Sequence, residues 1–151
     1  MTVEDVRALY QEEILRRVRH PLHHTLLEPF DAEAAGDNPM CGDRCTVRIR
    51  FGTDGDLAKV AFQGRGCAIS MASADLMAEA VGGHHIDEVR ELAAAFAKLV
   101  KTGASDDNIA AIEALRPLSG VAEYPSRIKC ATLPWAALIA ALDGAKEATS
   151  E

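Results

Sequence analysis

The spacing of hydrophobic residues changes along the chain, and these changes separate predicted helices from predicted strands. An amphipathic helix over residues 1–20 is indicated by apolar residues that recur every four positions, namely Val6, Tyr10, Ile14 and Val18. Thr2 and Asp5 form a capping-box pattern at its start. Pro21 disfavours helical geometry at His20, so the helix is expected to end there.

The next regular pattern is an alternation of apolar and polar residues from Cys45 to Phe51. This alternation predicts a half-buried strand, because successive side chains of a strand point to opposite faces. A turn over residues 52–55 and a returning strand over 57–63 complete a hairpin. Residues 21–40 are predicted to form an irregular connection with room for one edge strand.

Helical spacing returns after Gly66 and is kept through most of the remaining chain. It predicts helices over residues 69–80 and 87–101, a short helix after Ser105, a break at 120–125, and a last helix that ends near Leu142. Residues 145–151 are expected to be a frayed tail. Because strands come first and helices follow, the fold class is α+β: one domain over 1–151, with a small antiparallel sheet packed by helices.

Composition and charge narrow the function classes. The chain has 151 residues, 48% of them hydrophobic and 26% charged, as in a soluble globular protein. A net charge of −7 argues against a nucleic-acid surface and against a polybasic membrane anchor. No long apolar run or signal-peptide pattern is present, so we expect a cytoplasmic protein without nucleic-acid or membrane partners. Four cysteines in such a protein favour metal or sulfur chemistry over disulfides.

Cys41 and Asp43 are the first pair of candidate ligands. In an extended segment their side chains leave the same side of the backbone, and Gly42 between them removes bulk. The same segment is also typical of a turn, since Asn, Pro, Gly and Asp favour turns. Cys67 is a further candidate, because it is predicted to stand at a helix N-terminus, where free N–H groups and the helix dipole favour a thiolate.

Cys130 is the last candidate ligand and lies where the final helix begins. Pro134 lacks the N–H that would bond to the Cys130 carbonyl, so the helix is expected to start at Thr132 or to kink there. Cys130 is therefore predicted on irregular backbone. Arg127 lies beside it if that turn is helical, where its cation would lower the pKa of the thiol or cover the site.

Three thiolates and a carboxylate select zinc, copper(I) or an iron–sulfur cluster over magnesium or calcium. Arg65, Arg127 and Lys129 are candidates to offset the negative charge of such a site. Cys45 shares a face with apolar residues and is predicted to be buried rather than a ligand. The five histidines fall at helix boundaries and loops, where a solvated role is expected.

Taken together, three segments resemble the SufU-type branch of the U-type iron–sulfur assembly proteins, which is related to IscU and to the N-terminal domain of NifU. The segments are Asn38–Asp43, Gly64–Ser73 and Tyr124–Trp135. The resemblance covers nearly the whole chain and implies an IscU/SufU-like fold. It also implies a zinc site whose ligands are Cys41, Asp43, Cys67 and Cys130.

The resemblance further implies a zinc-dependent sulfurtransferase that accepts persulfide sulfur on Cys41. The donor would be a pyridoxal-phosphate cysteine desulfurase of the SufS type, and the sulfur would pass to downstream iron–sulfur assembly proteins. The chain would then be a sulfur-relay partner rather than a stand-alone enzyme. Arg127 matches the family's arginine near the site.

Two alternatives stay open at this point. The same ligands would suit iron, in a scaffold on which a transient [2Fe–2S] cluster is assembled, or a purely structural zinc module. IscU-type scaffolds carry His before the last cysteine, where this chain has Lys129. About 20 additional residues, roughly 103–122, precede the final motif, as in SufU-type proteins. Both features favour sulfur transfer.

Overall fold

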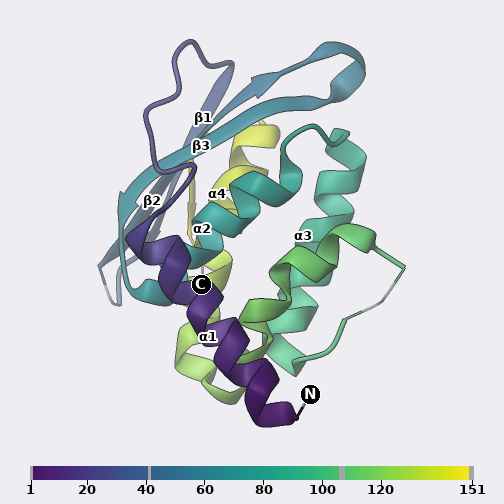
Figure 1. Cartoon of the computed structure of the whole chain (residues 1–151). Coiled ribbons are helices and arrows are strands. Elements are labelled where there is room, and N and C mark those ends of the chain that lie inside the picture. The colour runs from purple at the N-terminus through teal and green to yellow at the C-terminus, as the bar shows by residue number, and fades with distance from the viewer. Residues whose placement is uncertain (1, 41, 106–107, 150–151) are drawn as a thin grey trace.

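The computed structural model of the chain describes residues 2–40, 42–105 and 108–149 (Figure 1). Its elements follow one another as α1 (Val3–Arg19), β1 (Ala32–Asn38), β2 (Asp43–Phe51), η1 (Thr53–Gly55), β3 (Leu57–Arg65), α2 (Ala68–Val81), α3 (Ile86–Thr102), η2 (Ala110–Glu123), η3 (Pro125–Arg127), α4 (Ile128–Leu142) and β4 (Glu147–Thr149). The predicted α+β class is confirmed. Among the described residues, no helix has both the length and the apolar composition needed to cross a bilayer.

The four strands form one sheet in the order β3-β2-β1-β4. The β2–β3 pair is antiparallel, as the predicted hairpin requires, and β1 also pairs with β2 in antiparallel fashion. β4 pairs in parallel with β1, so the sheet is mixed, and Glu147–Thr149 form a strand inside the segment for which the sequence predicts fraying. Three residues are too few for an alternating pattern to be recognised, and only the neighbouring strand supplies their hydrogen-bond partners.

The hydrophobic core lies between the sheet and the helices that cover one of its faces. α4 packs on β1 and β2, and α2 packs on β3 (Figure 1). The alternation in β2 buries Val47 and Ile49 completely, as predicted. α3 packs against α4, where the ring of Phe96 stacks on that of Trp135 with 4.8 Å between the centroids. This packing fixes the ends of β2, α2 and α4 relative to one another.

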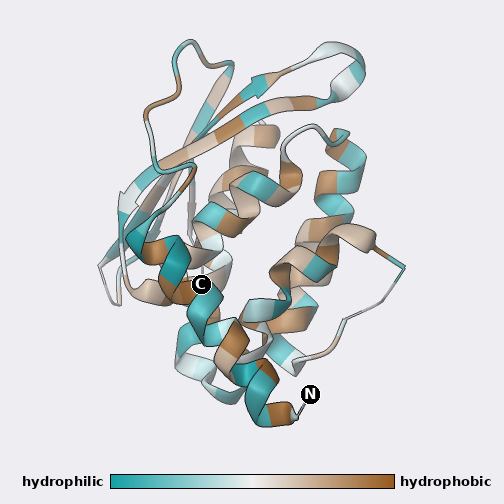
Figure 2. Ribbon diagram, in the orientation of Figure 1, coloured by the Kyte–Doolittle hydropathy of each residue, from teal (hydrophilic) through white to brown (hydrophobic). Residues whose placement is uncertain are grey.

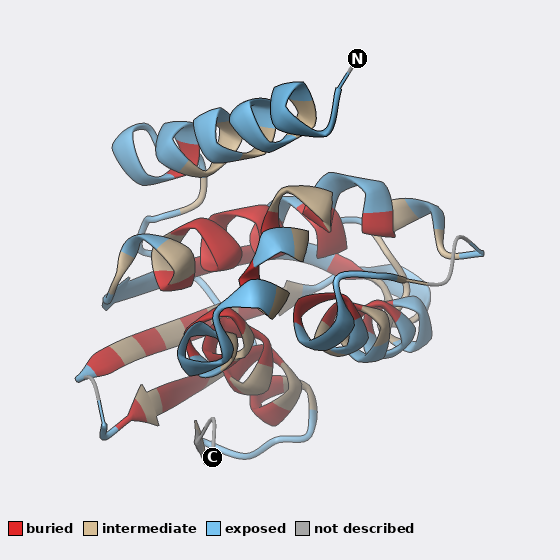
Figure 3. Cartoon of the chain, turned by 90° about the horizontal axis from the view of Figure 1, so that it is seen from below, coloured by how far each residue is buried: buried red, intermediate tan, exposed pale blue. Residues whose placement is uncertain are grey.

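α1 lies on the outside of this core. Its capping box between Thr2 and Asp5 forms as predicted, and the helix ends at His20. Hydrophilic and hydrophobic positions alternate along it (Figure 2), and most of its surface is exposed (Figure 3). The buried exception is Arg17, which pairs with Asp75 and Glu79 of α2. Burial alone would lower the pKa of Arg17, but its hydrogen bonds to carboxylates outweigh burial and raise it.

The segment between α3 and α4 differs from its prediction. Gly103 caps α3 in the left-handed conformation, with φ of 79°, which glycine adopts readily. The short helix after Ser105 is instead the 3-10 helix η2, and the predicted break at 120–125 is largely filled by η2 and η3. Pro117 inside η2 has no N–H to continue an α-helical hydrogen-bond ladder, and apolar side chains of η2 fill the space beside α3.

Candidate metal centre

The turn between β1 and β2 leads into Asp43, the first candidate ligand that the structure describes. Gly42 donates its N–H to the carbonyl of Asn38 at 2.9 Å and has φ of 75°, a left-handed conformation that favours glycine. The Asn38 side chain accepts from the N–H of Met40 at 3.2 Å. The turn interpretation is therefore correct for these residues, and the extended backbone begins at Asp43. Cys41 lies outside the residues that the structure describes.

Cys67 stands as the N-cap residue of α2, as the sequence predicts. Only Gly66 separates Cys67 from the end of β3. Because β3 pairs with β2 through Arg44 and Arg65, Cys67 lies at the same end of the sheet as Asp43. At this position the first N–H groups of α2 have no partners within the helix, and the helix dipole favours an anionic sulfur. Its side chain is partly buried.

Cys130 lies in the first turn of α4 and only 2% of its surface is exposed. The prediction of irregular backbone at this residue is wrong, because α4 begins at Ile128 and continues through Pro134. Thr132 is not the cap; its hydroxyl donates to the carbonyl of Ile128 at 3.1 Å. The hydroxyl of Ser73 in α2 donates to the carbonyl of Ala131 at 2.6 Å, and this buried contact anchors the first turn of α4 to α2.

These three residues, remote in sequence, converge. The ligand atoms of Asp43, Cys67 and Cys130 all lie within 4.8 Å of one another. Asp43 is buried, and its Oδ2 has no hydrogen-bond partner in the described part of the chain. A buried carboxylate oxygen without a partner is costly, and a cation in this position would satisfy it. The donor set therefore fits a soft divalent metal ion.

The groups of the cluster shift the pKa values of Cys130 and Arg127. Burial, together with the neighbouring Cys67 and Asp43, raises the pKa of the Cys130 thiol to about 12. Hydrogen bonding to Cys130 and the nearby charge of Cys67 raise the pKa of Arg127 in turn. Arg127 in η3 thus lies beside both thiols, as the sequence predicts if that turn is helical.

Gly66 and Ser70 complete the surroundings of Asp43. A Cβ atom at Gly66 would lie 2.9 Å from the Ser70 hydroxyl and 3.1 Å from both Cγ and Oδ1 of Asp43. Only a glycine leaves the carboxylate this space. Ser70 is 2% exposed and was not a candidate in the sequence, where it stands inside an apolar run. The sequence did contain a signal for Ser70, because it is a polar residue in the first turn of a helix that begins at a candidate ligand.

Cys45 and the histidines stay outside this cluster among the described residues. Cys45 is 3% exposed, and burial raises the pKa of its thiol to about 12, which confirms the prediction of a buried apolar role. His85 caps α3 by accepting from the N–H of Asp87, and His24 stacks on Phe62. No histidine of the described chain belongs to the ligand group.

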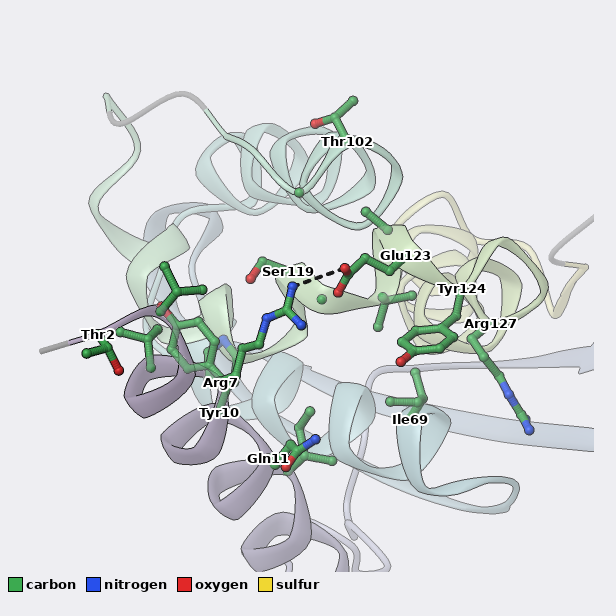
Figure 4. A pocket seen from close by; sticks show the side chains of 18 residues that line it. Thr2, Arg7, Tyr10, Gln11, Ile69, Thr102, Ser119, Glu123, Tyr124 and Arg127 are labelled. Atoms are coloured by element: carbon green, nitrogen blue, oxygen red, sulfur yellow. Dashed lines mark hydrogen bonds and ion pairs between the residues drawn. The ribbon is translucent and has the colours of Figure 1, made fainter.

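A cleft of about 640 Å³ lies next to the cluster, between α1, η2 and the end of α3. Apolar side chains form most of its walls, and Arg7 of α1 reaches Glu123 of η2 at 3.1 Å (Figure 4). Arg127 stands at its margin and points away from its centre (Figure 4). None of the described residues that line the cleft carries a thiol.

Comparison with known proteins places these observations in a family. Residues 9–131 match the family model described as the NifU-like N-terminal domain. The zinc-dependent sulfurtransferase SufU of Bacillus subtilis is 38% identical over 131 residues, which cover 86% of each chain. The iron–sulfur cluster assembly scaffold protein IscU of Streptococcus pyogenes is 35% identical over 138 residues, 91% of this chain and 85% of that one.

A solved structure gives the same result for the fold. The putative iron–sulfur cluster assembly scaffold protein for the SUF system from Fervidobacterium islandicum superposes with a TM-score of 0.78 at 30% identity, over 90% of this chain and 98% of that one. The match of the family model spans all three segments that supply the ligand cluster. The chain therefore belongs to the NifU-like N-terminal domain family, together with SufU and IscU.

Proposed function

We propose that this protein is a zinc-dependent sulfur acceptor in iron–sulfur cluster assembly. The observation that carries the proposal is the convergence of Asp43, Cys67 and Cys130 within 4.8 Å, with an unpartnered buried oxygen on Asp43. Cys41, two residues before Asp43 in the sequence, is proposed as the fourth ligand and as the acceptor thiol. Zinc bound there would hold the sulfur ligands as thiolates at neutral pH.

The proposed donor is the cysteine persulfide of a pyridoxal-phosphate cysteine desulfurase of the SufS type. The Cys41 thiolate attacks the outer sulfur of the donor persulfide, a new S–S bond forms on Cys41, and the donor's S–S bond breaks. The donor cysteine leaves as a thiolate, and the proton of the persulfide stays on the transferred sulfur. No external oxidant or reductant is consumed. The Cys41 persulfide would then supply downstream iron–sulfur assembly proteins.

Arg127 is proposed to act beside this step as a fixed cation. Its guanidinium is exposed yet interacts with the Cys130 and Cys67 thiols. A cation in that position stabilises thiolates. The similarity to the zinc-dependent sulfurtransferase SufU supports zinc as the metal of the present site.

The proposal is tested by mixing the zinc-loaded protein with a desulfurase and free cysteine and measuring intact mass. We expect one added sulfur on the wild-type protein and none on Cys41→Ala. Cys45→Ala is the matched control, because it removes a thiol that is 3% exposed and outside the cluster. Normal sulfur uptake by Cys41→Ala would contradict the assigned acceptor.

The alternative is a scaffold for a transient [2Fe–2S] cluster, and the relative named IscU favours it. Carboxylate ligation would suit such a role, since oxygen is a weaker ligand than sulfur for a cluster that must be released. Anaerobic reconstitution with iron and sulfide, followed by absorption spectra, distinguishes the two. A cluster that forms stably and passes to an acceptor protein, together with an absence of sulfur uptake on Cys41, would favour the scaffold.

A further inference from the structure

Exposed cations stand around the ligand cluster of a protein that is acidic as a whole. The chain has 23 acidic and 16 basic side chains. Arg65 is the last residue of β3, two positions before Cys67, so their Cα atoms lie within about 7 Å. Lys129 directly precedes Cys130, and both Arg65 and Lys129 are exposed. An exposed cation therefore lies within two residues of each of these two cysteines.

Arg65 also differs from most arginines of the chain in lacking a carboxylate partner. Ion pairs within 4.0 Å are made by seven others, namely Arg7, Arg16, Arg17, Arg44, Arg48, Arg90 and Arg116. Its cross-strand neighbour Arg44 is one of them and is paired with Asp37. Arg65 has no such pair in the described chain, so its charge is available to another molecule.

Two exposed apolar side chains accompany these cations. Met40, directly before Cys41, is 86% exposed, and Tyr124, in the segment that leads to Arg127, is 63% exposed. Arginine, methionine and tyrosine are enriched at protein interfaces, whereas a large apolar side chain in water gains nothing for the isolated fold. This composition is typical of a protein contact rather than of a site for a small molecule.

From these observations we propose that Arg65 and Lys129, with Met40 and Tyr124, form a docking face for an acidic protein surface around the donor's persulfide. The inference rests on the proposed function, since it names the chemistry of the donor's surface. Opposite charges on the two faces would speed and orient the encounter, and Met40 would enter the interface next to Cys41. The remainder of this acidic protein would repel the same partner, so only this face is favoured.

The competing explanation is that Arg65 and Lys129 only offset the charge of the metal site. The test is charge reversal in the zinc-loaded protein, with Arg65→Glu and Lys129→Glu made singly and together. Lys59→Glu is the matched control for Lys129, because Lys59 is exposed on β3 about 20 Å along the strand from Arg65. Arg19→Glu, at the C-terminal end of α1, controls for an unpaired exposed arginine.

Zinc content and the KM of a purified cysteine desulfurase for each variant are measured from about 0.01 M to about 1 M salt, over which the screening length falls from about 30 Å to about 3 Å. Docking by charge predicts that KM for wild-type protein rises with salt. It also predicts a KM about 10-fold higher for the double reversal at low salt, with unchanged zinc content and little effect in the controls. Replacement of acidic residues by lysine beside the donor's active site should restore a low KM for the double variant.

Three results would overturn the proposal. They are loss of zinc with unchanged KM, an equal effect on KM of the two docking-face reversals and the two control reversals, or a KM that does not change with salt concentration. The first would assign the cations to the metal, and the second to net charge alone. Direct binding of the desulfurase separates this proposal from the sulfur-transfer proposal. Salt-dependent binding lost on double reversal, without sulfur uptake by the wild-type protein, supports docking while contradicting sulfur transfer.

Discussion

Gly66→Ala is the substitution that most directly probes how the fold shapes the ligand cluster. The backbone at Gly66 does not have positive φ, so alanine can adopt it without conformational strain. The cost is steric. The new Cβ would lie 2.9 Å from the Ser70 hydroxyl and 3.1 Å from the Asp43 carboxylate, where ordinary contacts begin at 3.4 Å.

These neighbours must therefore move by about 0.3–0.5 Å, and neither has free space. Asp43 is 5% exposed and Ser70 2%. Loss of the groups that orient a ligand typically costs about 10- to 100-fold in metal affinity, and we expect a loss in that range for Gly66→Ala. Competition with a chromophoric chelator for zinc measures it.

Two controls make this prediction sharp. Gly120→Ala adds a Cβ with nothing within 4 Å and should leave zinc affinity unchanged. Adding Ser70→Ala to Gly66→Ala removes the closer of the two contacts and should recover part of the affinity. Wild-type zinc affinity in a folded Gly66→Ala protein would refute the reasoning, because it would mean that Asp43 is not held by this cradle.

Further predictions concern stability, reactivity and metal removal. Arg17→Met removes the cation that pairs with the buried carboxylate of Asp75. This substitution should lower the free energy of unfolding by about 3–5 kcal/mol in urea titrations. Arg16→Met, which breaks only a half-exposed pair, should cost less than about 1 kcal/mol, and equal losses would contradict the role of burial. The thiol of Cys45, with its pKa raised to about 12, should resist iodoacetamide at about pH 8 in the native protein and react once unfolded; native alkylation would show that the strand opens. Chelation of zinc should speed amide hydrogen exchange at residues 66–70 and 128–131 while β2 stays protected, whereas unchanged exchange there would argue against a metal at the cluster.

Local patterns were enough to predict several elements, and among the described ligands they predicted the position of Cys67. The capping box at Thr2 and the alternation in β2 depend on neighbours within a few residues, and both are present. Cys67 is placed at the start of α2 for the same reason. The resemblance of the three segments to one family is confirmed by the family match over residues 9–131.

Other features depend on contacts between residues far apart in sequence, and no local pattern indicates them. β4 exists because β1 offers it an unpaired edge. α4 begins at Ile128 and continues through Pro134, and its first turn contacts α2 through the hydrogen bond from the Ser73 hydroxyl to the Ala131 carbonyl. Only the packed structure decides that Asp43, Cys67 and Cys130 come within 4.8 Å, since that distance depends on how the core positions a strand and two helices. The sequence by itself determined which residues are able to bind a metal, and tertiary packing determined that they meet.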